Sequence, residues 1–217
     1  MSPRSIDDEG APSPRWPAGS VRKALHGGAL TDATRAAVST RLATPQVIEP
    51  RFFTSESLVT LRAVCARLVP QPHPGAVDIA GAIDTRLADG IGDGWRYDAM
   101  PSDGEAYERG LVGLDETARE MSGGAFIALS GERQDAVISA VEGGSPAGAT
   151  WRSLPARRFF EDLLAEAIEA YYSHPLGQEE IGYLGLADAP GWQLIQLGER
   201  HPRETPPVIG EQPHHDG

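Results

Sequence analysis

Five stretches of this chain carry apolar residues at steps of three and four positions, and clusters of glycine and proline separate them. That spacing is the repeat of an amphipathic α-helix, and no run of strand length alternates between apolar and polar residues. Glycine and proline break helix and strand interiors, so the 25 glycines and 18 prolines belong mostly in connections. The sequence therefore predicts an all-α fold: an irregular bundle of about five main helices with long Gly/Pro-rich loops and an extended N-terminal arm.

Capping residues and helix breakers set the limits of the predicted helices. The last of the five has two apolar positions per turn, which predicts the central helix of the core. The helices are expected from Ser55 to Pro70, from Ile79 to Asp89, from Asp103 to Ser122, from Ser130 to Gly143 and from Pro155 to Tyr172. The expected core residues are Leu58, Leu61, Leu68, Ile83, Leu87, Leu111, Leu114, Phe160, Leu163 and Ile168.

Residues 1–50 differ in composition, with six prolines and few large apolar side chains. A short helix over Thr31–Leu42, capped by Thr31 or Asp32, is the one element expected there. Such a segment buries too little to fold alone, so we expect an arm that lies along a larger partner, with Trp16 as its anchor. The alternatives are an arm packed on its own domain and one without fixed structure. A helical domain over 51–197 and a Pro/His-rich tail over 198–217 complete the predicted organisation.

The charge narrows the range of partners. With 19 basic and 31 acidic side chains the chain carries a formal charge of −12, which repels nucleic acid and anionic membrane surfaces. No apolar segment follows Met1, so neither a secretory signal nor membrane insertion is expected, and a cytoplasmic location is predicted. The single cysteine, Cys65, falls on the apolar side of the first predicted helix, where a thiol is a core residue rather than a nucleophile.

No catalytic constellation is legible in the sequence, and we predict no catalytic residue, cofactor site or metal site in this chain. The six histidines include no pair at the i, i+4 spacing of a helical zinc site. Two other functions stay open. One is a metal-dependent hydrolase that uses His73, His174 or His201 with nearby acids, and the other is a free-standing adaptor for an unrelated partner.

Aromatic residues occur in adjacent pairs, at Phe52 with Phe53, Phe159 with Phe160, and Tyr171 with Tyr172. Neighbours on a helix point about 100° apart, so both members of a pair cannot face one small core. At least one of each is expected to face a second surface, such as a partner chain. The predicted partner-binding residues are Trp16, Phe52, Phe159, Tyr172, His174 and Trp192.

An ordered set of short motifs resembles a known family. Between about Phe52 and Leu197 the chain is similar to gluconate 2-dehydrogenase subunit 3, the small or gamma subunit of bacterial flavin dehydrogenases. The motifs are Phe52-Phe53-Thr54, Arg67-Leu68-Val69-Pro70, Pro74-Gly75-Ala76-Val77, Ile83-Asp84, Tyr107 with Gly110-Leu111 and Leu114, Gly124 with Phe126 and Leu129, Phe159-Phe160 with Leu163, and Tyr172 with Pro175, Gly177 and Gly191-Trp192.

The resemblance implies a non-catalytic helical subunit that binds and stabilises a large flavoprotein of the glucose–methanol–choline oxidoreductase family. In such complexes the large chain holds FAD and oxidises a sugar, glycoside or sugar acid. Two departures are visible: the family's N-terminal twin-arginine export signal is missing, and Gly177-Gln178-Glu179-Glu180 replaces the family's Gly-Gly-Asn stretch. The missing export signal favours a cytoplasmic complex. Because the Gly-Gly-Asn stretch is replaced, contacts that other family members make there cannot be assigned to residues of this chain.

Overall fold

The computed structural model describes residues 19–27, 30–73, 75–92, 97 and 99–181. These residues form helices joined by turns and loops and contain no strand, so the all-α prediction is confirmed. The α-helices are α1 (Ser20–His26), α2 (Asp32–Leu42), α3 (Ser55–Leu68), α4 (Ile79–Ala88), α5 (Asp103–Ser122), α6 (Gly131–Glu142), α7 (Ala156–Tyr172) and α8 (Pro175–Glu180), with short 3₁₀ turns η1 (Phe126–Ala128) and η2 (Thr150–Arg152).

Local capping explains where the main helices begin and end. The Thr54 hydroxyl accepts a hydrogen bond from the Ser57 N–H at 3.1 Å, and the Asp78 carboxylate accepts one from the Gly81 N–H at 3.1 Å. These bonds satisfy donors that the first turns of α3 and α4 leave free. At the other end of α5, Gly123 takes a positive φ of 75°, a conformation that glycine adopts at low cost. The predicted helix from Asp103 to Ser122 is thus confirmed at both ends.

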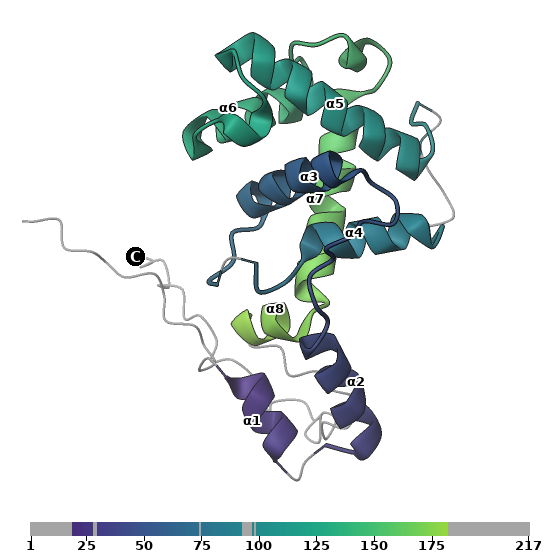
Figure 1. Cartoon of the computed structure of the whole chain (residues 1–217), viewed down its shortest axis with the longest axis vertical. Coiled ribbons are helices and arrows are strands. Elements are labelled where there is room, and N and C mark those ends of the chain that lie inside the picture. Colours follow the sequence, from purple (N-terminus) through teal and green to yellow (C-terminus); the bar gives the residue numbers. More distant parts are fainter. Residues whose placement is uncertain (1–18, 28–29, 74, 93–96, 98, 182–217) are drawn as a thin grey trace, which may run out of the picture.

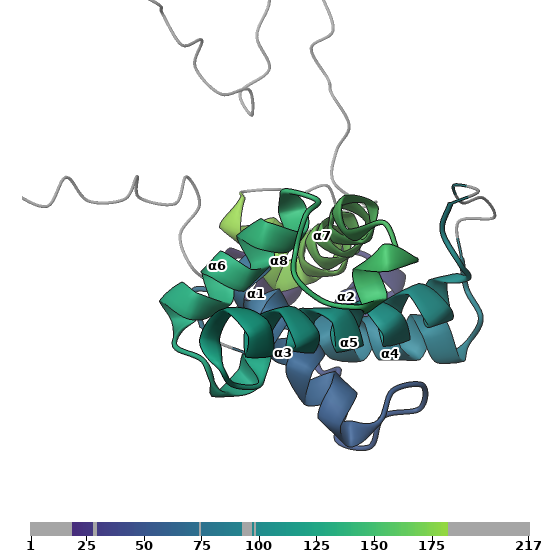
Figure 2. The same cartoon turned by 90° about the horizontal axis from the view of Figure 1, so that it is seen from above.

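Helix α7 is the central element, as its broad apolar stripe predicted. It contacts α3, α4, α5, α6 and α8. In Figure 1, α7 runs behind α3 and α4, with α5 and α6 near one of its ends and α8 at the other. Figure 2 shows the same bundle from above, with α7 seen almost end on beyond α5. Residues of α7 therefore meet side chains from most of the domain.

Most of the predicted core residues are confirmed. One predicted core residue and one predicted partner-binding residue are corrected. Leu58, Leu61, Ile83, Leu111, Leu114 and Leu163 are buried, and Leu68, Leu87 and Phe160 pack partly buried against them. Ile168, predicted to be in the core, is 41% exposed. Phe159, predicted to bind a partner, is 2% exposed inside the chain's own core. The rotation of α7 about its axis decides this, because the side that buries Leu163 and Phe159 turns Ile168 outward.

A glycine on α5 makes room for the Phe159 ring. A Cβ at Gly110 would lie 2.2 Å from ring carbons of Phe159, well inside van der Waals contact. The Phe159 ring also meets Tyr107 edge to face, with ring centroids 6.1 Å apart. The close approach of α5 and α7 therefore depends on the absence of a side chain at Gly110.

A buried carboxylate fixes the chain before α3. Asp84 on α4 is fully buried, and its oxygens accept backbone hydrogen bonds from Arg51 (2.8 Å), Phe52 (3.0 Å) and Phe53 (2.9 Å). Three charge-assisted bonds offset the cost of removing this carboxylate from water. Asp84 thus ties the aromatic turn before α3 to α4.

The described part of the N-terminal arm is helical and lies on its own domain. Helix α2, expected near Thr31–Leu42, is confirmed with Thr31 as its N-cap. Both α1 and α2 contact α8, where the Glu179 carboxylate accepts the N–H groups of Gly19 and Val21 at 2.6 Å each. The described residues of this segment therefore contact α8, as in the alternative in which the arm packs back on its own domain. Trp16 lies outside the described residues.

Within the described part of the chain, none of the helices combines the length and the apolar character needed to cross a membrane.

Candidate functional site

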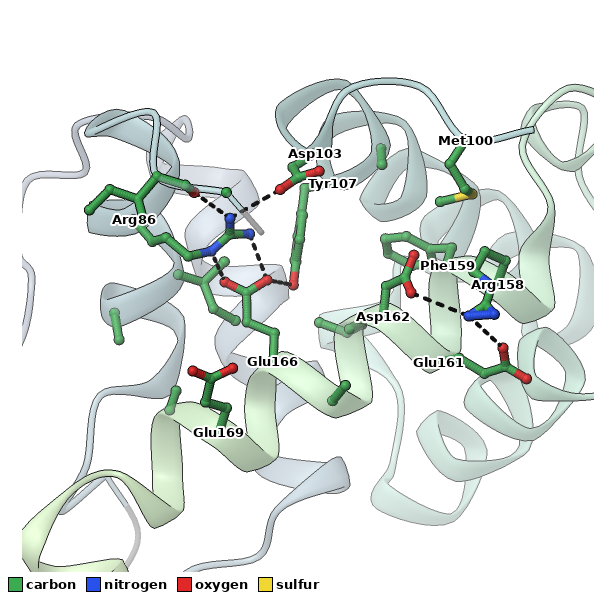
Figure 3. Close-up of a pocket in the computed structure, with 18 of the residues that line it drawn as sticks. Arg86, Met100, Asp103, Tyr107, Arg158, Phe159, Glu161, Asp162, Glu166 and Glu169 are labelled. Atoms are coloured by element: carbon green, nitrogen blue, oxygen red, sulfur yellow. Dashed lines mark hydrogen bonds and ion pairs between the residues drawn. The ribbon is translucent and has the colours of Figure 1, made fainter. Parts of the chain in front are cut away.

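A cavity of about 580 Å³ lies between α4, the first turns of α5, and α7. We call it the α7 cavity, because α7 supplies more of its lining residues than any other helix. Its apolar lining includes Ile83, Met100, Ala106 and Leu163, and charged side chains crowd the rest of it. Figure 3 shows these charged groups, which come from all three helices.

Arg86 of α4 connects the helices that form the cavity. Its Nε and Nη2 donate to the two carboxylate oxygens of Glu166 on α7, with Nη2 at 2.8 Å from Oε2. Its Nη1 donates to Asp103 of α5 at 3.1 Å and to the Ile91 carbonyl at 2.6 Å. Such a fork-to-fork pair fixes both side chains in one geometry.

Tyr107 completes this network from α5. Its hydroxyl donates to Glu166 Oε2 at 2.5 Å, and the ring is 4% exposed. Burial, reinforced by the negative charge of Glu166, raises the pKa of Tyr107 well above its ordinary value. Burial lowers the pKa of Arg86, but Glu166 and Asp103 more than offset this and raise it above the usual value. At neutral pH the network therefore holds a neutral phenol and a charged guanidinium.

Cys65 lies in the core, as predicted, and is not a reactive thiol. Burial, followed by the charges of Glu166 and Asp78, raises its pKa to about 12. A cysteine nucleophile needs a thiolate, which this environment disfavours. Glu166 is equally unsuited to act as a base, because Arg86 and Tyr107 already engage its oxygens. The arrangement positions charges and ties helices together.

The opposite side of the cavity holds a second arginine. The Arg158 guanidinium lies 3.8 Å from the centre of the Tyr97 ring, a cation–π contact. Arg158 also pairs with Glu161 at 3.2 Å and approaches Asp162 at 3.7 Å. The carboxylate of Glu169, one turn beyond Glu166 on α7, makes no hydrogen bond or ion pair with any residue that the structure describes. Figure 3 shows Glu169 beside Glu166.

The predicted partner-binding residues are not gathered at one place. Phe52 is partly buried against the core, where it meets the Phe53 ring edge to face at 5.0 Å. Tyr172 is 36% exposed on the outer side of α7. His174 is half-buried between α2 and α8, and Trp192 lies outside the described residues. Only Tyr172 of the described set presents a large exposed apolar surface.

The histidines of the hydrolase alternative are not assembled either. His73 is exposed ahead of α4, His174 lies at α8, and His201 falls outside the described residues. Over the described ranges, no three His, Cys, Asp or Glu side chains are grouped as metal ligands.

Reading the sequence did not reveal Arg86, Tyr107 and Glu166 as a connected group. In the sequence, Tyr107 stands out only as part of a family motif, and neither Arg86 nor Glu166 belongs to any of the patterns described above. The available signal was weak: Glu166 borders the apolar stripe at Leu163 and Ala167, and an acid there often needs a partner. Its partner Arg86 lies 80 residues away in the chain, beyond any local pattern.

The fold and cavity define a class: a helical protein whose described residues place charged side chains from three helices around one cavity. Compared with known protein families, the chain matches the model for gluconate 2-dehydrogenase subunit 3 over residues 55–195. It belongs to this family, within the span of Phe52 to Leu197 that the motifs indicated, and so to a family of dehydrogenase-complex subunits. No curated protein and no solved structure matches the chain.

Proposed function

We propose that this chain is the non-catalytic small subunit of a complex whose large subunit is an FAD-dependent oxidoreductase of the glucose–methanol–choline type. The large subunit would bind FAD and oxidise a sugar, glycoside or sugar acid. The small subunit would stabilise the large one and assist its folding. The observation that carries the proposal is the family match over residues 55–195.

The chemistry of the described site supports a binding role. The cavity's phenol and the core thiol both have raised pKa values, so neither ionises readily at neutral pH. The carboxylate of Glu166 is engaged by Arg86 and Tyr107. These groups serve to position charge on a rigid helical scaffold, which suits recognition of a partner protein better than a reaction on a substrate.

Co-production with a large oxidoreductase of the glucose–methanol–choline type, encoded beside this chain, tests the proposal. Purification through a tag on the small chain is expected to yield a yellow complex that oxidises a carbohydrate hydroxyl group. The isolated small chain is expected to be colourless and inactive. Flavin bound to the isolated small chain, or a large subunit equally soluble and active without it, would overturn the assignment.

A further inference from the structure

The described side chains that line the α7 cavity carry an excess of negative charge. Its described lining contains more carboxylates than guanidinium groups, and the carboxylates stand mainly on α7. An excess of this kind favours a cationic group as the occupant. The charged residues are Asp103, Glu161, Asp162, Glu166 and Glu169 against Arg86 and Arg158.

The chain's own arginines show which chemistry this lining accepts. Arg86 fits between Glu166 and Asp103, and Arg158 combines carboxylate contacts with the face of Tyr97. The carboxylate of Glu169 stands on the same wall without an ion-pair or hydrogen-bond partner among the described residues. The Glu169 carboxylate is therefore available to a cationic group other than Arg86 and Arg158.

The remaining lining suits a cation on an aliphatic stem. Met100, Pro101, Ala165 and Ala170 contribute apolar surface beside the acids. A volume of about 580 Å³ lies within the range of cavities that bind ligands. Arginine and lysine carry a charged head on a methylene chain that packs on apolar surface. The cavity therefore matches such a side chain better than a small hydrated metal ion.

An exposed apolar ridge lies directly beside Glu169. Ile168 is 41% and Tyr172 is 36% exposed, and the two stand one turn apart on α7. Exposed tyrosine is enriched among residues that dominate binding energy, and a neighbouring aliphatic side chain extends the apolar contact. The outer face of α7 thus combines an acidic cavity with an apolar ridge.

We propose that this face of α7 is where the chain binds its catalytic subunit, with an arginine or lysine of that subunit entering the cavity beside Glu169 and apolar residues covering Ile168 and Tyr172. This inference rests on the proposed function. It assigns the chemistry of the contact: a basic anchor next to an apolar patch.

Charge reversal with a matched control tests the inference. Glu169→Lys reverses one charge in the cavity, and Glu132→Lys makes the same change at an exposed glutamate of α6 outside it. We expect Glu169→Lys to raise the Kd for the co-produced catalytic subunit at least about tenfold, since like charges repel at such an interface. Glu132→Lys should leave the Kd within about twofold. Glu169→Gln should reduce the dependence of Kd on salt concentration.

The ridge is tested separately with Tyr172→Ala, which leaves the charges unchanged. It should raise the Kd about tenfold or more without altering the salt dependence. Circular dichroism of each variant checks that the helices are intact. Wild-type Kd in both Glu169→Lys and Tyr172→Ala would overturn the inference and leave the proposed function standing. Failure of the wild-type chain to bind the catalytic subunit would overturn both.

Two other occupants give distinct outcomes. Titration of the isolated chain with spermidine tests a free cation, and light scattering tests a second copy of this chain. Micromolar spermidine binding that Glu169→Lys abolishes, or a dimer that it dissociates, would replace the catalytic subunit as occupant and overturn the inference. Absence of both, together with the Kd changes above, supports it.

Discussion

The helical bundle and the N-terminal helices are held by different forces. From α3 to α7 the bundle buries one continuous apolar cluster that includes Phe126, Phe159 and Leu61. Among the side chains of α1 and α2 whose burial the structure describes, only Val21 and Val38 are buried, and polar contacts with residues at α8 attach these helices. Apolar burial gives stability that varies little with pH, whereas a few hydrogen bonds to ionisable groups give a contact that responds to pH and to single substitutions.

The largest effect is expected where the bundle is most tightly packed. Phe159→Ala empties a site next to Gly110 and Tyr107 and should reduce the free energy of unfolding by about 3–5 kcal/mol. Phe160→Ala removes a partly buried ring and should cost about 1–2 kcal/mol. Urea denaturation of the two variants compares them directly. Equal losses in the free energy of unfolding would mean that the two adjacent rings contribute equally to the packing of α7.

Asp84 tests whether the bundle also depends on a buried polar group. Asp84→Ala leaves the backbone N–H groups of Arg51, Phe52 and Phe53 without their acceptor and should cost about 2–3 kcal/mol. Asp89→Ala serves as the control, because it removes only an exposed ion pair to Arg51 and should cost less than about 1 kcal/mol. If Asp84→Ala reduced the free energy of unfolding as little as the control does, apolar packing alone would hold the aromatic turn before α3 in place.

Glu179 tests the attachment of α1. Glu179→Ala removes both acceptors for Gly19 and Val21, and amide hydrogen exchange in α1 should quicken roughly tenfold, as expected for the loss of charge-assisted bonds. Exchange in α5 and α7 should not change, because they belong to the bundle core. The exposed Glu49 provides a matched control, since Glu49→Ala removes no contact of α1. Faster exchange throughout the bundle would show that the two regions unfold together.

The smallest effect concerns pH at the contact between α2 and α8. His174 Nδ1 accepts the Leu176 N–H at 3.2 Å, and its Nε2 lies 3.1 Å from the Arg41 carbonyl, an arrangement that suits the neutral ring. Burial lowers the pKa of His174 below its ordinary 6.5. The contact is therefore complete above about pH 6.5 and weakens as the pH falls through the lowered pKa of the folded state.

Hydrogen exchange of α2 between pH 7.5 and pH 5, corrected for the intrinsic rate, measures this loss. His174→Asn should remove most of the pH dependence, while the control His73→Gln, at an exposed histidine, should retain it. Protection that increases toward acidic pH would contradict the neutral-ring arrangement.

Reading the sequence identified the elements whose signals are local. Gly123 ends α5, Thr54 begins α3, and the two apolar positions per turn of α7 mark it as the central helix. These features depend on residues within one or two turns of each other, so capping and spacing were enough to predict them. The motifs between Phe52 and Leu197 also indicated the family, which the match over 55–195 confirms.

Tertiary structure alone decided which side each helix shows to the others. Phe159 and Phe160 are adjacent, and only the rotation of α7 against α5 placed Phe159 in the core and left Ile168 exposed. The pairing of Arg86 with Glu166 joins residues 80 positions apart, through contacts that form only when α4 packs on α7. Helical periodicity determines that a side will be buried, but small rotations and long-range ion pairs depend on packing between helices, which no local pattern encodes.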